Sequence, residues 1–285
     1  MRNLLKPLAF VIAIACTLAV PFARASDTTN PDGSIKTFGF IGHPTYDFSR
    51  FTVLTTGDLN DNNNTVTGPS SIVGSVGVAG QGNFTMSDGT LNGDLYINDS
   101  GTITLSGPAK ITGHKYGLHY QGGSQAMVLG NALQAAQYLS NQAATDTNTG
   151  SYTVTQGSFN GMTENGNQNV TLMGSGHIVL NLQDFVMTGG TFTLSGTAMT
   201  TYIINVRNNF SLNNAKIVLG GQLIASHVLF NIIGKGSDVA MQQGTSMQGI
   251  LLAVQRKVNL SGGKVFGKVI AEQLALTSGG QVISQ

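Results

Sequence analysis

A short strand pattern recurs along most of the chain and restricts the folds that the chain can adopt. In each copy an apolar, a small and a second apolar residue are followed in most cases by Ser, Asn or Thr, and Gly often lies close behind. Clear copies begin at Phe84, Ile103, Phe192, Phe210, Val258 and Leu274, and looser copies begin at Val170 and Val239. The third position moves from 86 to 105, from 172 to 194 and 212, and from 241 to 260 and 276, a spacing of 16 to 22 residues. Repetition at such intervals is typical of folds built from stacked repeats.

A second pattern places Gly and one further residue before an apolar strand. Copies begin at Gly74, Gly93, Gly221, Gly249 and Gly267. Two strands and two Gly-rich corners in roughly 18 residues describe one coil of a stacked-repeat fold, so we predict a mainly β protein, a β-solenoid. Alternation along the first strand turns Phe84 and Met86 inward and Thr85 outward. The second strand is apolar on both sides, which indicates that its outer side is covered.

A segment with helical periodicity interrupts the repeats. Residues 125–144 contain no Pro, and Ser124 is the expected N-cap after a Gly-Gly break. The apolar stripe at helical spacing consists of Leu129, Leu133, Ala136, Leu139 and Ala143. We expect a helical insert at about residues 124–145, one long α-helix packed alongside about six coils, which are spaced ~4.8 Å apart. It would cover the apolar outer side of the second strands; the alternative is a helix docked elsewhere.

The N-terminus has the pattern of an export signal. Arg2 and Lys6 precede an apolar stretch, Leu8–Val20, and Ala23-Arg24-Ala25 forms a cleavage site. We therefore expect a signal peptide at residues 1–25 and a single β-solenoid domain at residues 26–285. A lipoprotein signal ending at Cys16 is the alternative. The expected location is secreted, extracellular or at the cell surface, with no membrane span after signal cleavage.

Composition excludes several classes of protein. Charged residues make up 9% and hydrophobic residues 41% of the chain, which is unlike a disordered protein. The formal net charge is +1, so no nucleic-acid partner is expected. The 38 Gly residues argue against a helical bundle, and they lack the three-residue period of collagen. Signal cleavage would remove the one Cys, so neither a disulfide nor a thiolate metal site is expected.

The acidic residues do not indicate a catalytic site. Asp88, Asp94 and Asp99 form the densest acidic group within the recognised coils, and the Asp88-Gly89 pair is typical of a turn. No Ser-His-Asp catalytic triad can be recognised in the sequence. We therefore expect no catalytic residue and no enzymatic activity. A glycan-active β-helix enzyme remains as a third, weaker hypothesis, which a cleft lined by two or more acids would favour.

Two further groups were considered as metal ligands. Asp58, Asn60 and Asn62 have the spacing of the first half of a calcium loop, but the Gly and the Glu that such a loop requires are absent. His114 and His119 are five residues apart and lack a legible third ligand. We expect no metal and no cofactor.

Several segments together resemble a known family. Phe51–Leu54 with Gly57-Asp58, Val73–Gly80 and the helical segment Leu129–Leu139 occur in the family's order. The strongest similarity is in Ile224–Ile232, Met247–Ala253 and Gly267–Ala271, which is similar to an ending of the form SxxxLFN…GxxLA…GxVIA. These features resemble choice-of-anchor A family domains, which are secreted bacterial surface or adhesive domains. The resemblance covers roughly residues 50 to 285.

The same landmarks are also similar to bacterial ice-binding domains, which are discontinuous β-solenoids with a flanking helix. This resemblance implies a right-handed β-helix and supports the fold better than the function, because its motifs are glycines and core positions. Surface domains of this kind usually precede an anchor. No LPxTG-like motif or apolar C-terminal segment follows here, so we expect a freely exported protein or one held non-covalently.

The outward position of the strand pattern offers a candidate binding surface. Its members are Thr85, Thr104, Thr171, Thr193, Ser211, Ala240, Asn259 and Ala275. Stacked in register, these small side chains would form one flat face, on which Thr85, Thr104, Thr171, Thr193, Ser211 and Asn259 are the hypothetical ligand-binding residues. Thr hydroxyl and methyl groups on such a face could order water in the manner of ice. Thr and Ser are also common on any exposed strand, which is the simpler interpretation.

Two functions therefore follow from the sequence. The first is an exported, non-catalytic adhesive or structural protein that presents a rigid solenoid surface to an extracellular surface or glycan. The alternative is an ice-binding protein that uses the Thr-rich face. The C-terminal coil has no evident cap, so we also expect weak self-association through that solenoid end.

Overall fold

The computed structural model describes residues 48–57, 59–62, 70–159, 163–166 and 168–285. The expected signal peptide, Cys16 and the polar segment before Phe48 lie outside these residues, as does Asp58. Within the described residues, no helix has both the length and the apolar character that a membrane span requires.

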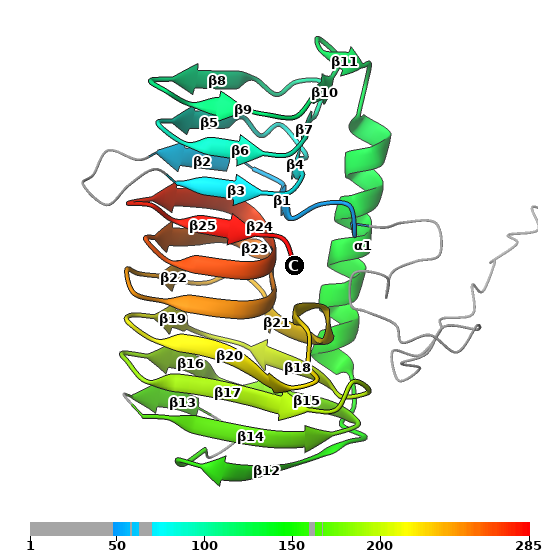
Figure 1. Ribbon diagram of the computed structural model, residues 1–285. Helices are drawn as coiled ribbons and strands as arrows, with labels where there is room; N and C mark the ends of the chain where they lie inside the picture. The colour runs from blue at the N-terminus through cyan, green and yellow to red at the C-terminus, as the bar shows by residue number, and fades with distance from the viewer. Residues whose placement is uncertain (1–47, 58, 63–69, 160–162, 167) are drawn as a thin grey trace, which may run out of the picture.

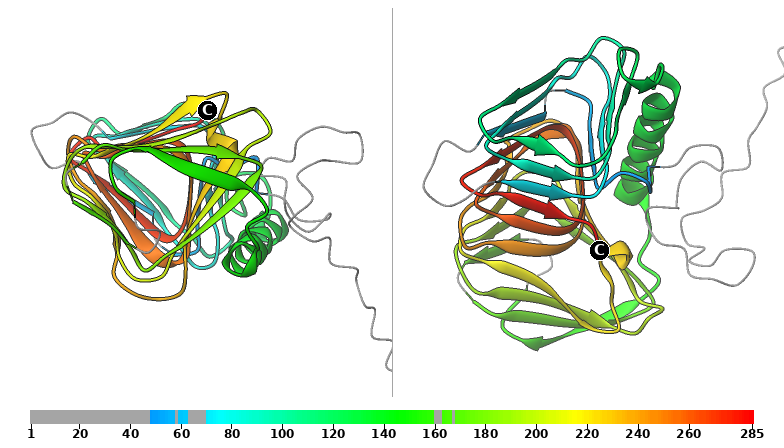
Figure 2. Two further views of the ribbon diagram at one scale, coloured as in Figure 1. Left: turned by 90° about the horizontal axis from the view of Figure 1, so that it is seen from below. Right: turned by 45° about the horizontal axis from the view of Figure 1, so that its top comes forward.

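The strands wind into a solenoid of about ten turns with three faces (Figures 1 and 2). Face A contains β2 (Leu59–Asn62), β5 (Phe84–Ser87), β8 (Ile103–Ser106), β13 (Thr163–Gly166), β16 (Asp184–Met187), β19 (Phe210–Leu212), β22 (Val239–Met241) and the last parts of β23 (Ser246–Ser261) and β24 (Lys264–Thr277). Face B contains β3 (Ser71–Val73), β6 (Thr90–Asn92), β9 (Lys110–Ile111), β12 (Ser151–Gln156), β14 (Val170–Ser175), β17 (Thr191–Gly196), β20 (Lys216–Gly221), β25 (Gln281–Ile283) and the first parts of β23 and β24. Face C contains β1 (Val53–Thr55), β4 (Val76–Val78), β7 (Leu95–Ile97), β10 (Lys115–Gly117), β11 (Gln121–Gly122), β15 (His177–Leu182), β18 (Thr201–Val206), β21 (Val228–Ile232) and the middle parts of β23 and β24.

The predicted β-solenoid is confirmed, but the prediction of two strands per coil was wrong. Each coil has three strands, and the view along the axis is triangular (Figure 2). In the first coils the face B strands are short, such as Ser71–Val73 and Thr90–Asn92, so the sequence pattern does not distinguish them from corners. Inward side chains of all three faces share one core, in which Phe185 and Phe210 stack with their ring centroids 5.4 Å apart.

The order of the coils in space differs from their order in the chain. β1 pairs in parallel with both β4 and β24, and β25 pairs with β3. The coils from β22 to β25 therefore lie in the middle of the stack, between the first coils and those that follow the helix (Figure 1). Because the last strand is paired on both sides, the C-terminal coil is not a free solenoid end, and the basis for the predicted self-association through that end was wrong.

The antiparallel strand β12 lies at one end of the stack. It pairs with β14, with a register shift between Val154 and Gln156. This pairing interrupts the parallel ladder at the edge where another chain could otherwise add a parallel strand, and such irregular edges disfavour edge-to-edge association.

The helix α1 (Ala126–Thr145) covers face C, as predicted. Its buried residues Leu129, Ala136 and Leu139 share an apolar cluster with Ile203 and Leu252 of the strands. Four of the five predicted copies of the Gly-first pattern supply face C strands. The prediction of a strand directly after Gly221 was wrong, because the 3₁₀ helix η1 (Ala225–His227) follows and the strand begins only at Val228.

A close approach of the helix explains one glycine of face C. A Cβ atom at Gly77 would lie 3.0 Å from Cδ2 of Leu129 and 3.0 Å from Cδ1 of Leu54. Larger residues at this position would push the helix away from the sheet. The helix begins one residue later than expected: Gln125 is its N-cap residue, while the Ser124 hydroxyl donates to Asp99 Oδ2 at 2.6 Å.

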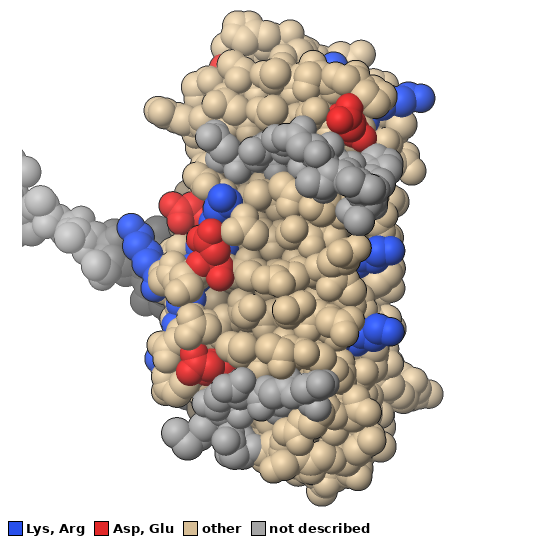
Figure 3. Space-filling model, turned by 90° about the vertical axis from the view of Figure 1, so that its left-hand side faces the viewer, with Lys and Arg blue, Asp and Glu red and all other residues tan. Residues whose placement is uncertain are grey.

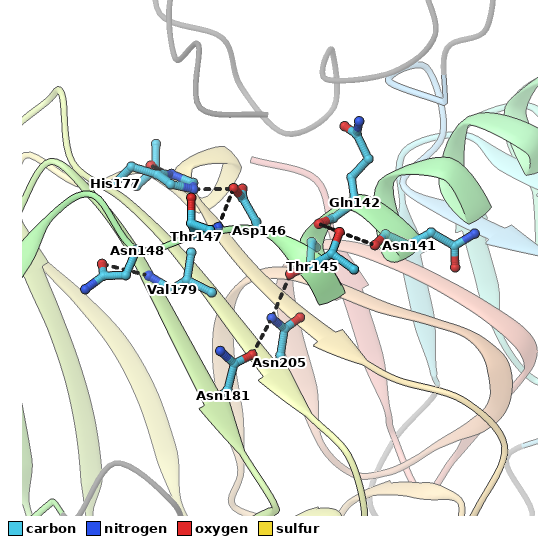
Figure 4. A network of polar contacts seen from close by, with 12 residues as sticks. Asn141, Gln142, Thr145, Asp146, Thr147, Asn148, His177, Val179, Asn181 and Asn205 are labelled. Atoms are coloured by element: carbon cyan, nitrogen blue, oxygen red, sulfur yellow. Dashed lines mark hydrogen bonds and ion pairs between the residues drawn. The ribbon is translucent and has the colours of Figure 1, made fainter. Parts of the chain in front are cut away.

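A ladder of asparagines spans three neighbouring coils, and two of its members bind the helix. Asn181, Asn205 and Asn231 occupy successive register positions on β15, β18 and β21. Each amide Nδ2 of Asn205 and Asn231 donates at 2.9 Å to the Oδ1 of the preceding Asn. Figure 4 shows the first of these contacts below the helix end. Asn205 also donates to the carbonyl of Ala143 at 2.7 Å, and Asn231 donates to that of Ser140 at 2.9 Å. The buried amides therefore give the docking a defined register.

The C-terminal end of α1 is held by a buried contact between a histidine and an aspartate. Nε2 of His177 lies 2.9 Å from Oδ2 of Asp146, the residue that ends the helix (Figure 4). Nδ1 of the same ring lies 2.7 Å from the hydroxyl of Thr201. Both side chains are almost fully buried, so the contact is structural and gives no access to a substrate.

A buried arginine closes a corner between faces C and A. The guanidinium of Arg256 donates to the carbonyls of Arg207, Asn208, Ile233, Gly234 and Ser237. Burial lowers the pKa of Arg256 below the usual value. The side chain satisfies carbonyls of two loops and joins neighbouring coils.

Candidate functional site

The outward positions of face A form one continuous register. The row, named here the face A row, runs Val186, Ser211, Ala240, Asn259, Ala275, Asn60, Thr85 and Thr104. Four of the predicted ligand-binding residues, Thr85, Thr104, Ser211 and Asn259, lie on it. Neighbouring strands are ~4.8 Å apart, so these side chains share a surface without all being adjacent.

The two remaining predicted residues lie on a different face. Thr171 of β14 pairs with Thr193 of β17, and Thr193 pairs with Val218 of β20, all on face B. The expectation of one ladder containing all six residues was therefore wrong. Strands of faces A and B have the same alternation of apolar and small residues, and this pattern does not encode the face on which a strand lies.

Face A is not a regular array of threonines. Thr85 and Thr104 are neighbours near one end of the stack, but Ala275, Asn259 and Ala240 occupy the middle. The Asn259 amide donates to Asp238 Oδ2 at 2.8 Å, so this amide is already hydrogen-bonded within the protein. Figure 3, seen from the side on which faces A and B meet, shows acidic and basic groups along the left margin, basic groups and one acidic patch along the right margin, and few charged groups among the described residues between them.

Face B carries two outward rows that the sequence analysis did not identify. The first, named here the lysine row, contains Thr191, Lys216, Ser246, Lys264, Gln281, Ser71, Thr90 and Lys110. The second, named here the apolar row, contains Val218, Phe266, Ile283 and Val73, with Gln248 at the position between Val218 and Phe266. Their strands were mostly interpreted as corners, which is why the rows were missed.

A hollow lies at the margin of face B, next to the apolar row. It has a volume of about 310 Å³ and is lined by Leu219, Leu223, Ile224, Ala225, Ser226, Gln248 and Gln285. Ile224 is 52% exposed although it is large and apolar. The backbone N–H of Leu219 donates to Oε1 of Gln248 at 2.8 Å, which fixes the orientation of this amide. The hollow thus combines an apolar wall with one oriented amide.

His227 of η1 lies close to this hollow in the chain and is almost fully buried. Its Nδ1 has no hydrogen-bond partner among the described residues. Burial lowers the pKa of His227, because the charged imidazolium loses its hydration there. The ring is therefore held neutral at physiological pH.

The acidic residues considered for catalysis do not converge. Asp88 has a φ of 58°, as expected for a turn, and Oδ1 of Asp94 accepts the backbone N–H of His114 at 2.8 Å. Asp99 accepts the hydroxyl of Ser124. In the described part of the chain, no three His, Cys, Asp or Glu side chains lie close enough to hold a metal ion. No pair of acids lines the hollow.

Three solved structures to which the chain is similar are ice-binding proteins. The chain is similar to a glycosylated ice-binding protein, LeIBP, from an Arctic yeast, with a TM-score of 0.53 and 16% identity over 83% of this chain and 91% of that one. An ice-binding protein from the Antarctic ascomycete Antarctomyces psychrotrophicus has a TM-score of 0.42 and 10% identity, covering 82% and 94%. A domain of ice-binding protein 1 from Shewanella frigidimarina has a TM-score of 0.39 and 15% identity, covering 83% and 94%. The likeness to LeIBP, at 16% identity, concerns the fold alone.

A family model assigns the chain to a protein family, which the similar solved structures alone do not. No curated protein matches the chain. The family model described as "Putative Ice-binding-like adhesive domain" (pAdhesive_15) matches residues 44–283, which is most of the chain and nearly all of the solenoid. The chain therefore belongs to the ice-binding-like adhesive domain family.

Proposed function

We propose that the chain is an exported adhesive module that binds an extended ligand on an exposed face of the solenoid. The observation that carries the proposal is the unequal covering of the three faces. The helix covers face C, whereas no helix of the described residues lies over the outward rows of faces A and B (Figure 1). Membership of the adhesive family supports this assignment.

The physical basis is a rigid, repetitive surface. Strands in register place side chains at ~4.8 Å intervals along the stack, so a linear ligand can make many similar contacts. The contacts are weak individually, but the scaffold is preorganised and little conformational freedom is lost on binding. Export is supported by the N-terminal pattern of a signal peptide.

The test is a solid-phase binding assay of the purified exported chain on glycans, lipid vesicles, bacterial cells and ice. Three matched variants place one Glu on each side of the molecule: Ala275→Glu on face A, Val218→Glu on face B and Met127→Glu on the outer side of α1, where Met127 is 78% exposed. We expect saturable binding that one of the first two variants abolishes and Met127→Glu leaves unchanged. A folded chain that binds none of these surfaces would contradict the proposal.

Ice is the second candidate ligand. The middle of the face A row is uncharged and carries small side chains, Ser211, Ala240 and Ala275, and a flat uncharged surface suits an ordered water lattice. The fold shared with LeIBP is consistent with this candidate.

The assay for ice is inhibition of recrystallisation by the wild-type chain, with Thr104→Tyr and Thr193→Tyr beside it. These variants place a bulky ring on faces A and B respectively. Loss of activity in one variant alone would assign ice binding to that face. A folded but inactive wild-type chain would remove ice from the candidates.

A further inference from the structure

We propose that face B binds an acidic, N-acetylated polysaccharide that lies along the lysine row and the apolar row. The inference rests on the proposed adhesive function and names the face and the class of ligand. Three features carry it: lysines free of ion pairs, an exposed apolar row beside them, and a hollow with an oriented amide.

The lysine row gives face B a positive charge at regular positions. Lys216 and Lys264 are two strands apart in register, about 10 Å at the usual strand spacing. Lys110 lies four strands beyond Lys264, about 19 Å. All three side chains are exposed. Basic groups project from one edge of the molecule in Figure 3.

No acid offsets these charges on the strands of face B. The face B segments Ser71–Val73, Thr90–Asn92, Lys216–Gly221, Ser246–Gln248 and Lys264–Phe266 contain neither Asp nor Glu. Among the described residues, no carboxylate lies within ion-pair distance of Lys110, Lys216 or Lys264. Unpaired cations at fixed spacing are complementary to a polymer that carries one anion per repeat.

The apolar row lies beside the lysines on the same face. Val73 is 36% exposed, and Val218, Phe266 and Ile283 are partly exposed. Row positions two residues apart along a strand are about 7 Å apart, so one ligand can contact both rows. The C–H faces of pyranose rings pack on apolar and aromatic side chains, while charged substituents at the ring edge can contact the lysines.

The hollow adds a site for an acetamido group. Because Oε1 of Gln248 accepts the Leu219 N–H, the Nε2 donors of the same amide point elsewhere. No acceptor among the described residues lies within hydrogen-bond distance of Nε2. An acetamido carbonyl can accept from Nε2 while its methyl group contacts Leu223 and Ile224.

Binding of four probes to the full exported chain tests the proposal. Hyaluronan carries a carboxylate and an acetamido group in each repeat, polygalacturonate carries only carboxylates, and chitohexaose carries only acetamido groups. Phosphatidylglycerol vesicles represent an anionic membrane. We expect the affinity to be highest for hyaluronan, lower for polygalacturonate and lowest for chitohexaose. Preference for the vesicles over both acidic polysaccharides would overturn the proposal in favour of a membrane partner.

Charge-matched variants assign the face. Lys216→Gln/Lys264→Gln should lower the affinity for hyaluronan about tenfold, the combined effect expected of two exposed ionic contacts. Lys235→Gln/Lys257→Gln removes the same charge away from face B and should leave the affinity unchanged. Equal losses in both double variants, or none in the first, would contradict the assignment to face B.

Gln248→Leu tests the hollow separately. It should weaken binding of hyaluronan and leave binding of polygalacturonate unchanged, because only the former has an acetamido group. Thermal unfolding checks that each variant is folded. If the chain binds other surfaces but no acidic glycan, this inference fails and the adhesive function stands. If it binds no surface at all, the adhesive function fails as well.

Discussion

Faces B and C both carry apolar side chains on their outer side, but within the described part of the chain only face C is covered, by α1. On face C the outward residues Ile203, Leu229 and Leu252 are at most 2% exposed beneath α1. On face B, Val73 is 36% exposed, and Phe266 and Ile283 are partly exposed. The two faces belong to the same coils, and they differ because α1 packs on face C.

The comparison indicates different roles for the two faces. On face C the polar atoms are satisfied within the protein by the asparagine ladder and the helix carbonyls, as expected for a structural interface. On face B the polar groups, Lys216, Lys264 and Gln248 Nε2, have no partner among the described residues. Unsatisfied groups beside exposed apolar side chains are characteristic of a binding surface.

The largest effect on the free energy of unfolding is expected from placing a charge under the helix. Leu129→Asp should lower the free energy of unfolding by about 5 kcal/mol, because Leu129 is fully buried and a lone carboxylate there has no partner. Met127→Asp, two residues away on the exposed side, should change it by less than about 0.5 kcal/mol. Urea unfolding measures both. Similar values for the two variants would contradict the packing of α1 on face C.

A smaller effect is expected from interrupting the asparagine ladder. Asn205→Ala removes three hydrogen bonds and leaves the Ala143 carbonyl without its donor, so a loss of about 3 kcal/mol is expected. Asn181 lies at the exposed end of the ladder, so Asn181→Ala should lower the free energy of unfolding by less than about 1 kcal/mol. Equal losses would indicate that the amides are not the source of the docking register.

The next effect in size is a pH dependence of stability that comes from His227. Because burial lowers the folded-state pKa of His227 below the usual value of 6.5, the unfolded chain binds more protons between these two values. The contribution of His227 to the free energy of unfolding should therefore be fully present above pH 6.5. It should be lost as the pH falls through the folded-state pKa. His227→Gln should remove this part of the pH dependence in unfolding titrations. An unchanged pH profile would show that His227 is not the responsible group.

The smallest effect on stability is expected on face B. Val73→Thr keeps the strand shape and should change the free energy of unfolding by less than about 0.5 kcal/mol, since Val73 is exposed. The same kind of change on face C, Leu252→Thr, should cost about 3 kcal/mol. Parallel unfolding curves of the two variants test whether the apolar row of face B is dispensable for folding.

Much of the fold was predictable because it is encoded locally. The spacing of the strand copies predicted the solenoid, and the stripe from Leu129 to Ala143 predicted a helix on the apolar face. The coil order was not predictable, because the pairing of β25 with β3 joins residues about 200 positions apart. Local periodicity contains no information on such a contact.

The candidate site was predictable only in part. Thr85, Thr104, Ser211 and Asn259 were placed correctly in one row, whereas Thr171 and Thr193 belong to face B. The lysine row was missed because no copy of either strand pattern includes Lys110, Lys216 or Lys264, which begin β9, β20 and β24. Only the register of the whole stack brings Lys216, Lys264 and Lys110 onto one face.

Covalent footprinting of the bound chain tests whether face B is the binding surface. A carbene-generating probe would label the exported chain alone and on the surface to which it adheres, and mass spectrometry would locate the protected residues. We predict protection of Val73, Phe266 and Ile283 on face B, with Met127 on α1 labelled equally in both states. Protection confined to α1 or to the face A row would contradict binding through face B.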